Sequence, residues 1–160
     1  MKKIITGLLF LLFLLSSCAG YEPIFSSKNL QFKISNYTLQ GDKILGNKIY
    51  SKLNNLSKLN KNEENKNIFD LFINISKDKV GTSKDSTGKI LEYKITLKAN
   101  IHFTDITINE KKIDETYTYS SSYKVQNQFS DTINVENVTI ENLLDKIHQE
   151  LLIKLSENIE

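Results

Sequence analysis

The sequence predicts an α+β domain: a four-stranded, mostly antiparallel sheet with two helices packed on one face, in the order β-α-β-β-β-α. Apolar and polar residues alternate with a period of two in several segments, which is typical of strands that bury one face. Two other segments carry apolar residues at helical spacing along one side. These apolar surfaces are buried together if both helices cover the same face of the sheet.

The first strand is predicted at about 29–36, where apolar and polar residues alternate. A helix is expected from Asp42 to about Leu59, because its apolar residues fall on one helical face. These residues are Leu45, Ile49, Leu53 and Leu56. The stretch "NKNEENKN", 60–67, has no apolar residue and is predicted to be a solvated connector.

The second strand is predicted at about 69–76, followed by an exposed loop "DKVGTSKDSTGK" over 78–89 that contains two glycines. The clearest alternation of the chain follows at 91–104 and predicts a long third strand with one buried face. If strands one and two are parallel neighbours, the crossover between them is expected to be right-handed.

A turn is predicted near 109–111, and the alternation over 113–125 then predicts a hairpin partner for the third strand. The polar stretch 127–137 is poorly patterned and is predicted to be a loop. A second amphipathic helix reaches almost to the end of the chain. Its apolar face consists of Ile140, Leu143, Leu144, Ile147, Leu151 and Leu155.

The beginning of the chain is typical of an export signal, with Lys2 and Lys3 before an apolar run that ends at Leu15. As a helix, the twelve residues from Ile4 to Leu15 span only about 18 Å, less than the ~30 Å of a bilayer core. The sequence Leu15-Ser16-Ser17-Cys18 resembles the lipobox of bacterial lipoproteins. This resemblance implies cleavage after residues 1–17, lipid attachment to the Cys18 thiol, and fatty acyl chains such as palmitate on the new amino terminus.

The remaining 143 residues suit one domain, which we expect to span 29–160 after a lipidated lead-in at 18–28. Two of the 21 lysines lie in the predicted signal, so 19 basic residues remain against 19 acidic ones. This balance predicts no nucleic-acid partner, because nucleic-acid binding usually shows a basic stripe interleaved with aromatic residues.

The residue inventory predicts neither an enzyme nor a cofactor or metal site. His102 and Asp105 are three apart on a strand, so their side chains point to opposite faces and cannot share a metal. His102 and His148 are interpreted as surface histidines. The row Tyr117, Tyr119 and Tyr123 favours packing under the helices over a role in stacking on a ligand.

The residues after Cys18, Gly20-Tyr21-Glu22-Pro23-Ile24-Phe25, resemble the start of the mature lipopolysaccharide-assembly lipoproteins of alphaproteobacteria, the LptE family. The long strand "LEYKITLKANIHF" and the terminal helix ending "ELLIKL" also resemble that family. The resemblance implies an outer-membrane lipoprotein on the periplasmic face. Such a protein plugs and helps to assemble the LptD-type β-barrel, and assists delivery of lipopolysaccharide to the cell surface. Ala19, in place of Asp, favours the outer membrane by the sorting rule of enteric bacteria.

The resemblance implies that basic residues before the long strand contact lipopolysaccharide. Lys84 and Lys89 are the candidates for this contact in the present sequence. Lys77, just before the predicted loop, and Lys79, within it, are further lysines whose ammonium groups can bind phosphate or can simply be solvated. A second basic site of the family, before the last helix, has no counterpart, because "FSDTINVEN" contains no positive charge. The alternative function is a membrane-tethered periplasmic carrier of a lipid or small molecule, which requires a cavity between helices and sheet.

Overall fold

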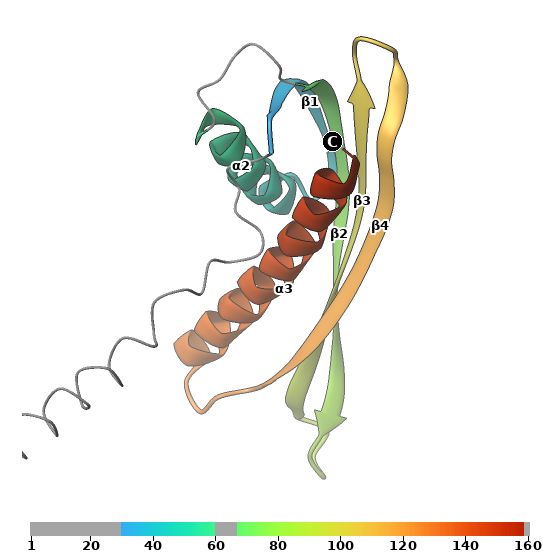
Figure 1. The fold of residues 1–160 in the computed structure, drawn as a ribbon. Coiled ribbons are helices and arrows are strands. Elements are labelled where there is room, and N and C mark those ends of the chain that lie inside the picture. Colours follow the sequence, from blue (N-terminus) through green and yellow to red (C-terminus); the bar gives the residue numbers. More distant parts are fainter. Residues whose placement is uncertain (1–29, 60–66, 159–160) are drawn as a thin grey trace, which may run out of the picture.

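The structure, a computed structural model, describes residues 30–59 and 67–158 (Figure 1). Its elements in chain order are β1 (Phe32–Gly41), α2 (Lys43–Leu59), β2 (Asn67–Lys84), β3 (Ile90–Asp105), β4 (Glu110–Lys124) and α3 (Phe129–Asn158). This order confirms the predicted β-α-β-β-β-α fold. The predicted signal at 1–17 and the lead-in at 18–28 lie outside the described residues.

The four strands form one sheet in the order β1-β2-β3-β4. β1 pairs in parallel with β2, from Phe32 opposite Asn67 to Gly41 opposite Ile75. The pairs β2–β3 and β3–β4 are antiparallel. The sheet is therefore mixed, and its single parallel pair is the one that the α2 crossover connects.

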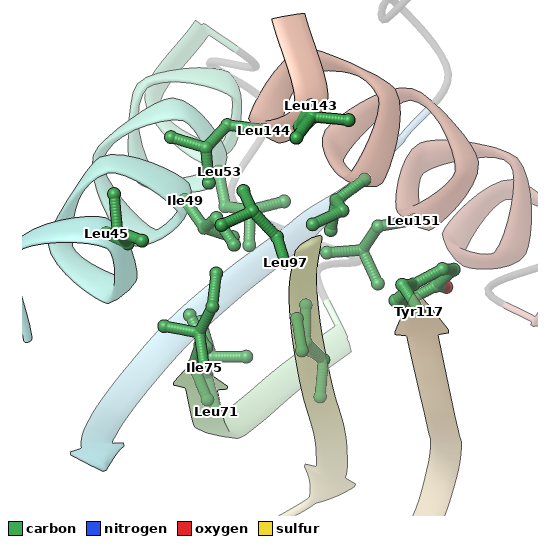
Figure 2. Packing of buried hydrophobic residues seen from close by; sticks show 14 of the residues in the cluster. Leu45, Ile49, Leu53, Leu71, Ile75, Leu97, Tyr117, Leu143, Leu144 and Leu151 are labelled. Carbon is green, nitrogen blue, oxygen red and sulfur yellow. The ribbon is translucent and has the colours of Figure 1, made fainter. Parts of the chain in front are cut away.

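Both helices lie on the same side of the sheet, α2 over β1 and α3 over β4 and β3 (Figure 1). Figure 2 shows Leu97 of β3 pointing between Leu53 of α2 and Leu144 of α3. All three side chains are fully buried. Burial of one such side chain contributes about 1.5–3 kcal/mol to stability, so this layer of apolar contacts holds the helices to the sheet.

The junction between β1 and α2 depends on two adjacent residues. Gly41 has φ +72°, and a Cβ atom there would lie 2.2 Å from the carbonyl oxygen of Ile75. That oxygen accepts a hydrogen bond of 2.7 Å from the backbone N–H of Asp42. The Asp42 carboxylate then accepts hydrogen bonds from the N–H groups of Ile44 and Leu45, both 3.1 Å, which caps the helix.

The two helices run in the same direction, because their ion pairs advance by one turn on both. Lys48 pairs with Glu141, and Lys52 pairs with Asp145. These side chains are about one-third to one-half exposed, and ion pairs at the surface typically contribute less than about 1 kcal/mol each. Apolar burial beneath them therefore outweighs the ion pairs in holding α2 against α3.

Two predicted loops were wrong. β2 continues to Lys84, so most of 78–89 is strand, and the connection to β3 is a short turn at 85–89. α3 begins at Phe129, so most of 127–137 is helix. Residues 76–84 are exposed and have no buried face. The first turns of α3 do have an inward face, but it includes the buried Thr132 and the half-buried Glu136, while Phe129 and Ile133 are exposed. Neither segment therefore shows the apolar periodicity of its element.

β1 was also predicted too early, at about 29–36 instead of 32–41. A shift of register between Ile34 and Asn36 interrupts its alternation. Beyond that point β1 is an edge strand whose side chains are mostly exposed.

Candidate functional site

The β2–β3 hairpin extends well past both helices (Figure 1). Its strands remain paired from Ile75 opposite Ala99 to Lys84 opposite Ile90, although all side chains from Ser76 to Lys84 are exposed. The β3 residues opposite Lys77 and Lys79 are Leu97 and Ile95, which are still fully buried in the core. Beyond Gly81, backbone hydrogen bonds rather than a core hold the strands together, and register shifts occur on either side of Ser83. The hairpin is therefore a polar ribbon that projects from the packed body.

Lys84 and Lys89 flank the tip of this hairpin. The Asp85 N–H donates to the carbonyl of Lys89 at 2.9 Å, and Gly88, with φ +87°, donates to the carbonyl of Asp85 at 3.0 Å. The Asp85 carboxylate accepts hydrogen bonds from the Thr87 hydroxyl at 2.6 Å and from the N–H of Lys89 at 3.0 Å. The turn thus brings both predicted lysines to one exposed end of the molecule.

Asp85 fixes the charge pattern of the tip as well as its shape. The hydrogen bond from the Thr87 hydroxyl lowers the pKa of Asp85, and the Lys89 ammonium acts in the same direction. At the tip, Lys84 and Lys89 therefore flank the ionised Asp85 carboxylate. This carboxylate already accepts hydrogen bonds from within the turn. This arrangement can bind a phosphate or another anion at the lysines.

Lys79, nearer the body, has a different role from the tip lysines. Its ammonium lies 2.5 Å from the Glu136 carboxylate of α3 and 4.3 Å from the centroid of the Tyr93 ring. The Tyr123 hydroxyl donates to the same carboxylate at 2.8 Å. Lys79 thus joins the projecting hairpin to the first half of α3 and is already engaged.

The electrostatics of this group agree with its geometry. Partial burial opposes ionisation of Glu136, but the hydrogen bonds from Lys79 and Tyr123 outweigh it and lower the pKa of Glu136. Partial burial likewise opposes protonation of Lys79, but the hydrogen bond with Glu136 outweighs it and raises the pKa of Lys79. Sequence reasoning missed this contact, because its two partners are 57 residues apart and Glu136 lay in a predicted loop.

The tyrosine row packs under α3, as predicted. Tyr117 and Tyr123 are buried, and Tyr119 is half-buried beneath Lys146, whose ammonium lies 4.3 Å from the ring centroid. The row therefore belongs to the core and its rim.

The opposite face of the sheet carries mostly uncharged polar side chains. Asn36 donates to Asp70 at 3.0 Å, and Thr116 donates to Asn100 at 2.9 Å, both between neighbouring strands. His102 lies on this face, stacked against Phe72 with ring centroids 5.3 Å apart. No helix of the described part covers this face (Figure 1), and the side chains on it are mainly polar.

Both histidines are half-buried, so the interpretation of each as a surface histidine was wrong. His102 lies on the open face with its Nδ1 2.6 Å from the Asp114 carboxylate, whereas Asp105 is buried on the helix side, so His102 and Asp105 stay apart as predicted. The Nε2 atom of His148, on α3, is buried without a hydrogen-bond partner within 30–59 and 67–158. Over the same residues, no group of three or more potential ligand side chains gathers around a metal position.

The predicted lipid-attachment residue, Cys18, lies outside the described residues. The described chain begins at Leu30, beside the first residues of β1. Within the described ranges, neither helix is long and apolar enough to cross a membrane.

The fold matches several solved proteins. A protein from Caulobacter crescentus, described as a candidate lipoprotein, has a TM-score of 0.53 and 11% identity, covering 79% of this chain and 89% of that one. Lipoprotein B of Nitrosomonas europaea, an uncharacterized protein, has a TM-score of 0.52 and 10% identity, with coverages of 77% and 83%. A minor lipoprotein of Acinetobacter baumannii has a TM-score of 0.52 and 15% identity, with coverages of 79% and 94%.

No protein-family model matches the chain, and no curated protein matches its sequence. The three solved neighbours are described as bacterial lipoproteins, and at these low identities the likeness concerns the fold. This chain thus shares the fold of a group of bacterial lipoproteins.

Proposed function

We propose that the chain is an outer-membrane lipoprotein of lipopolysaccharide assembly, similar to the LptE family, anchored through Cys18 with its domain on the periplasmic side. It plugs an LptD-type β-barrel, assists assembly of that barrel and helps to pass lipopolysaccharide to the cell surface. The combination of Leu15-Ser16-Ser17-Cys18 with a fold found in solved bacterial lipoproteins carries the proposal. The proposal assigns no reaction and no cofactor to the chain.

The physical properties of the domain suit a plug. Its two helices and sheet are held by one continuous core, so the body can keep its shape inside a partner. The open sheet face is polar and already hydrogen-bonded across its strands, as in the Asn36–Asp70 and Thr116–Asn100 pairs. Such a face is compatible with the hydrated interior of a large β-barrel. A lipid anchor would raise the local concentration of the barrel on the same membrane.

The projecting hairpin is the proposed contact for lipopolysaccharide. Lys84 and Lys89 lie at its exposed tip and are available for phosphate groups, while Lys79 is engaged with Glu136. A lysine ammonium is a compact, strongly hydrated charge that commonly binds phosphate. We therefore assign the contact to the tip and not to the base of the hairpin.

The alternative carrier function requires room for a ligand between helices and sheet. That space is filled by large side chains, of which Ile49, Leu53, Leu97, Ile101, Leu144 and Leu151 are all fully buried. Their packing favours the plug over the carrier.

Purification of the anchored chain in mild detergent tests the plug function. We expect an LptD-type β-barrel, identified by mass spectrometry, to copurify in near-equal amount. The Cys18→Ser variant provides the control, because loss of the anchor should leave an unprocessed precursor in the inner membrane and reduce recovery of the barrel. Absence of a large β-barrel from the wild-type preparation contradicts the plug. A lipid retained by the unlipidated domain instead supports the carrier.

The lysine contact is tested by the double variant Lys84→Ala/Lys89→Ala, titrated with fluorescent lipopolysaccharide. We expect binding to weaken about tenfold, equivalent to about 1.4 kcal/mol. The matched control, Lys43→Ala/Lys58→Ala, removes two exposed lysines from α2 and should bind like wild type. Equal affinities for the two double variants would assign the tip lysines to solvation alone.

A further inference from the structure

The turn between β3 and β4 displays two apolar side chains to solvent. Ile106 is 44% exposed and Ile108 is 55% exposed. The turn is ordered by the Asp105 carboxylate, which accepts a hydrogen bond of 2.8 Å from the N–H of Thr107, and by Asn109 in the left-handed region at φ +53°. The two isoleucines are thus held outward at the tip of a defined turn.

This turn lies at the end of the sheet where the chain enters the domain. The N–H of Ile106 donates to the carbonyl of Ile68 at 3.1 Å, and Ile68 pairs with Lys33 of β1. With strands about 4.8 Å apart, the start of β1 lies within roughly 10 Å of the turn. Figure 1 shows the turn and the beginnings of β1 and β2 at the same end of the molecule.

The chain between this end and the proposed anchor is short. Cys18 precedes Leu30 by 12 residues, which span at most about 40 Å when fully extended. A lipid on Cys18 therefore keeps the start of β1, and with it the β3–β4 turn, within reach of the bilayer.

We propose that the β3–β4 turn is a second membrane contact, in which Ile106 and Ile108 enter the lipid interface of the bilayer that holds the anchor. The inference rests on the proposed lipidation of Cys18. Two partly exposed isoleucines offer too little apolar area to hold a free protein on a membrane. For a tethered domain the local concentration of lipid is high, so a weak apolar contact is sufficient.

A second contact at this end orients the domain. β3 has 16 residues, and at about 3.3 Å each it spans roughly 50 Å. The hairpin tip carrying Lys84 and Lys89 therefore lies about that far along the sheet from the β3–β4 turn. The membrane contact and the proposed anion contact then lie at opposite ends of the sheet.

The test uses two features of the sequence: the chain has a single cysteine and no tryptophan. The chain from Cys18 onward is coupled through its thiol to a maleimide lipid in phosphatidylcholine vesicles. This places the anchor independently of whether cells lipidate Cys18, so failure of the inference is distinguishable from failure of the proposed function. Single tryptophans are introduced by Ile108→Trp and, at the far hairpin, by Val80→Trp, which replaces a residue that is 44% exposed.

We expect brominated acyl chains to quench the tryptophan of Ile108→Trp several-fold more strongly than that of Val80→Trp, with a blue shift of its emission on coupling. The uncoupled Cys18→Ser chain carrying Ile108→Trp should show neither effect at the same vesicle concentration. Equal quenching at the two positions overturns the proposal. A blue shift in the emission of Ile108→Trp that appears only after addition of a solubilised β-barrel also overturns the proposal, because the turn then contacts a protein and not lipid.

Since tryptophan itself favours membrane interfaces, a second measurement uses the chain without it. Hydrogen exchange at the turn amides is compared between the coupled wild-type chain and the coupled Ile106→Ser/Ile108→Ser variant. Slower exchange of the wild-type turn on coupling, lost in the double variant, supports the contact. Identical exchange in both coupled chains contradicts it, and matching circular dichroism spectra confirm that both are folded.

Discussion

At the residue scale, Gly41 is the position where a single methyl group should do most harm. The substitution Gly41→Ala places a Cβ 2.2 Å from the Ile75 carbonyl oxygen and also forces a left-handed backbone on an L-residue. We expect it to lower the free energy of unfolding by about 2 kcal/mol or more, measured by urea denaturation. Gly88→Ala is the matched control, since its φ is +87° but nothing lies within 4 Å of the added atom. Equal decreases in the free energy of unfolding for the two variants would show that the structure relieves the clash at Gly41 without loss of stability.

Two buried tyrosines separate the effect of packing from that of a hydrogen bond. The Tyr117 hydroxyl is buried without a hydrogen-bond partner in the described part of the chain, and burial raises the pKa of Tyr117 to about 12. Tyr117→Phe should therefore leave stability unchanged or slightly higher. Tyr123→Phe removes the bond to Glu136 and should cost about 1.5–3 kcal/mol, because the acceptor is ionised. Thermal and urea unfolding of both variants test this contrast, and a greater loss for Tyr117→Phe would contradict it.

At the scale of elements, burial decided which segments could be predicted. The strand at 91–104 and the helix from 42 to 59 were predicted almost at their observed bounds, because each presents one continuous apolar face to the core. The segment 78–84 was missed because its residues are exposed and it is held by backbone pairing. The first turns of α3 were missed because their inward face includes polar residues such as Thr132 and Glu136, the latter paired with Lys79. Local sequence carries no periodic signal for contacts of that kind.

The packing of α2 against α3 should depend on pH through His148. Burial, reinforced by the Lys52 ammonium and opposed by Asp145, lowers the pKa of His148 below its ordinary value of 6.5. The unfolded chain therefore binds a proton at this site more readily than the folded one. The resulting stability is fully present above about pH 6.5 and is lost as the pH falls toward the folded-state pKa.

Urea denaturation between pH 7.5 and 5 tests this dependence. We expect the free energy of unfolding to fall less steeply with acidification in His148→Gln than in wild type. Parallel curves for the two proteins would assign the acid sensitivity to other groups.

At the scale of the whole molecule, the fold and the proposed contact should be separable. Replacement of residues 82–92 by Asn-Gly joins Gly81 to Tyr93, which are already paired, through a two-residue turn suited to hairpins. We expect the free energy of unfolding of the shortened domain to lie within about 1 kcal/mol of the wild-type value, because the deleted residues are mostly exposed. It should lose lipopolysaccharide binding in the same titration as the lysine variants. Retained binding would move the contact away from the hairpin tip.

The candidate site could be predicted only in part, for reasons that apply to the whole chain. Lys84 and Lys89 were chosen through a family resemblance, and the structure places them together because the Asp85 turn closes between them. In a chain with 21 lysines, composition alone could not separate them from Lys79, which is engaged with an acidic residue distant in sequence. Cys18 depends on a local processing motif and stays a prediction.

The parallel pairing of β1 with β2 has a consequence for the order of folding. The antiparallel pairs β2–β3 and β3–β4 can form between neighbouring segments, whereas Phe32 must find Asn67 across the entire α2 crossover. Contacts between residues far apart in the sequence form late, because closing the loop between them costs entropy before the stabilising contacts are made. We therefore expect β1 to be the last strand to join the sheet. If the chain is exported and processed before Cys18 as proposed, β1 is then still unpaired when the other strands have formed, which gives a processing enzyme more time to act before the fold is complete.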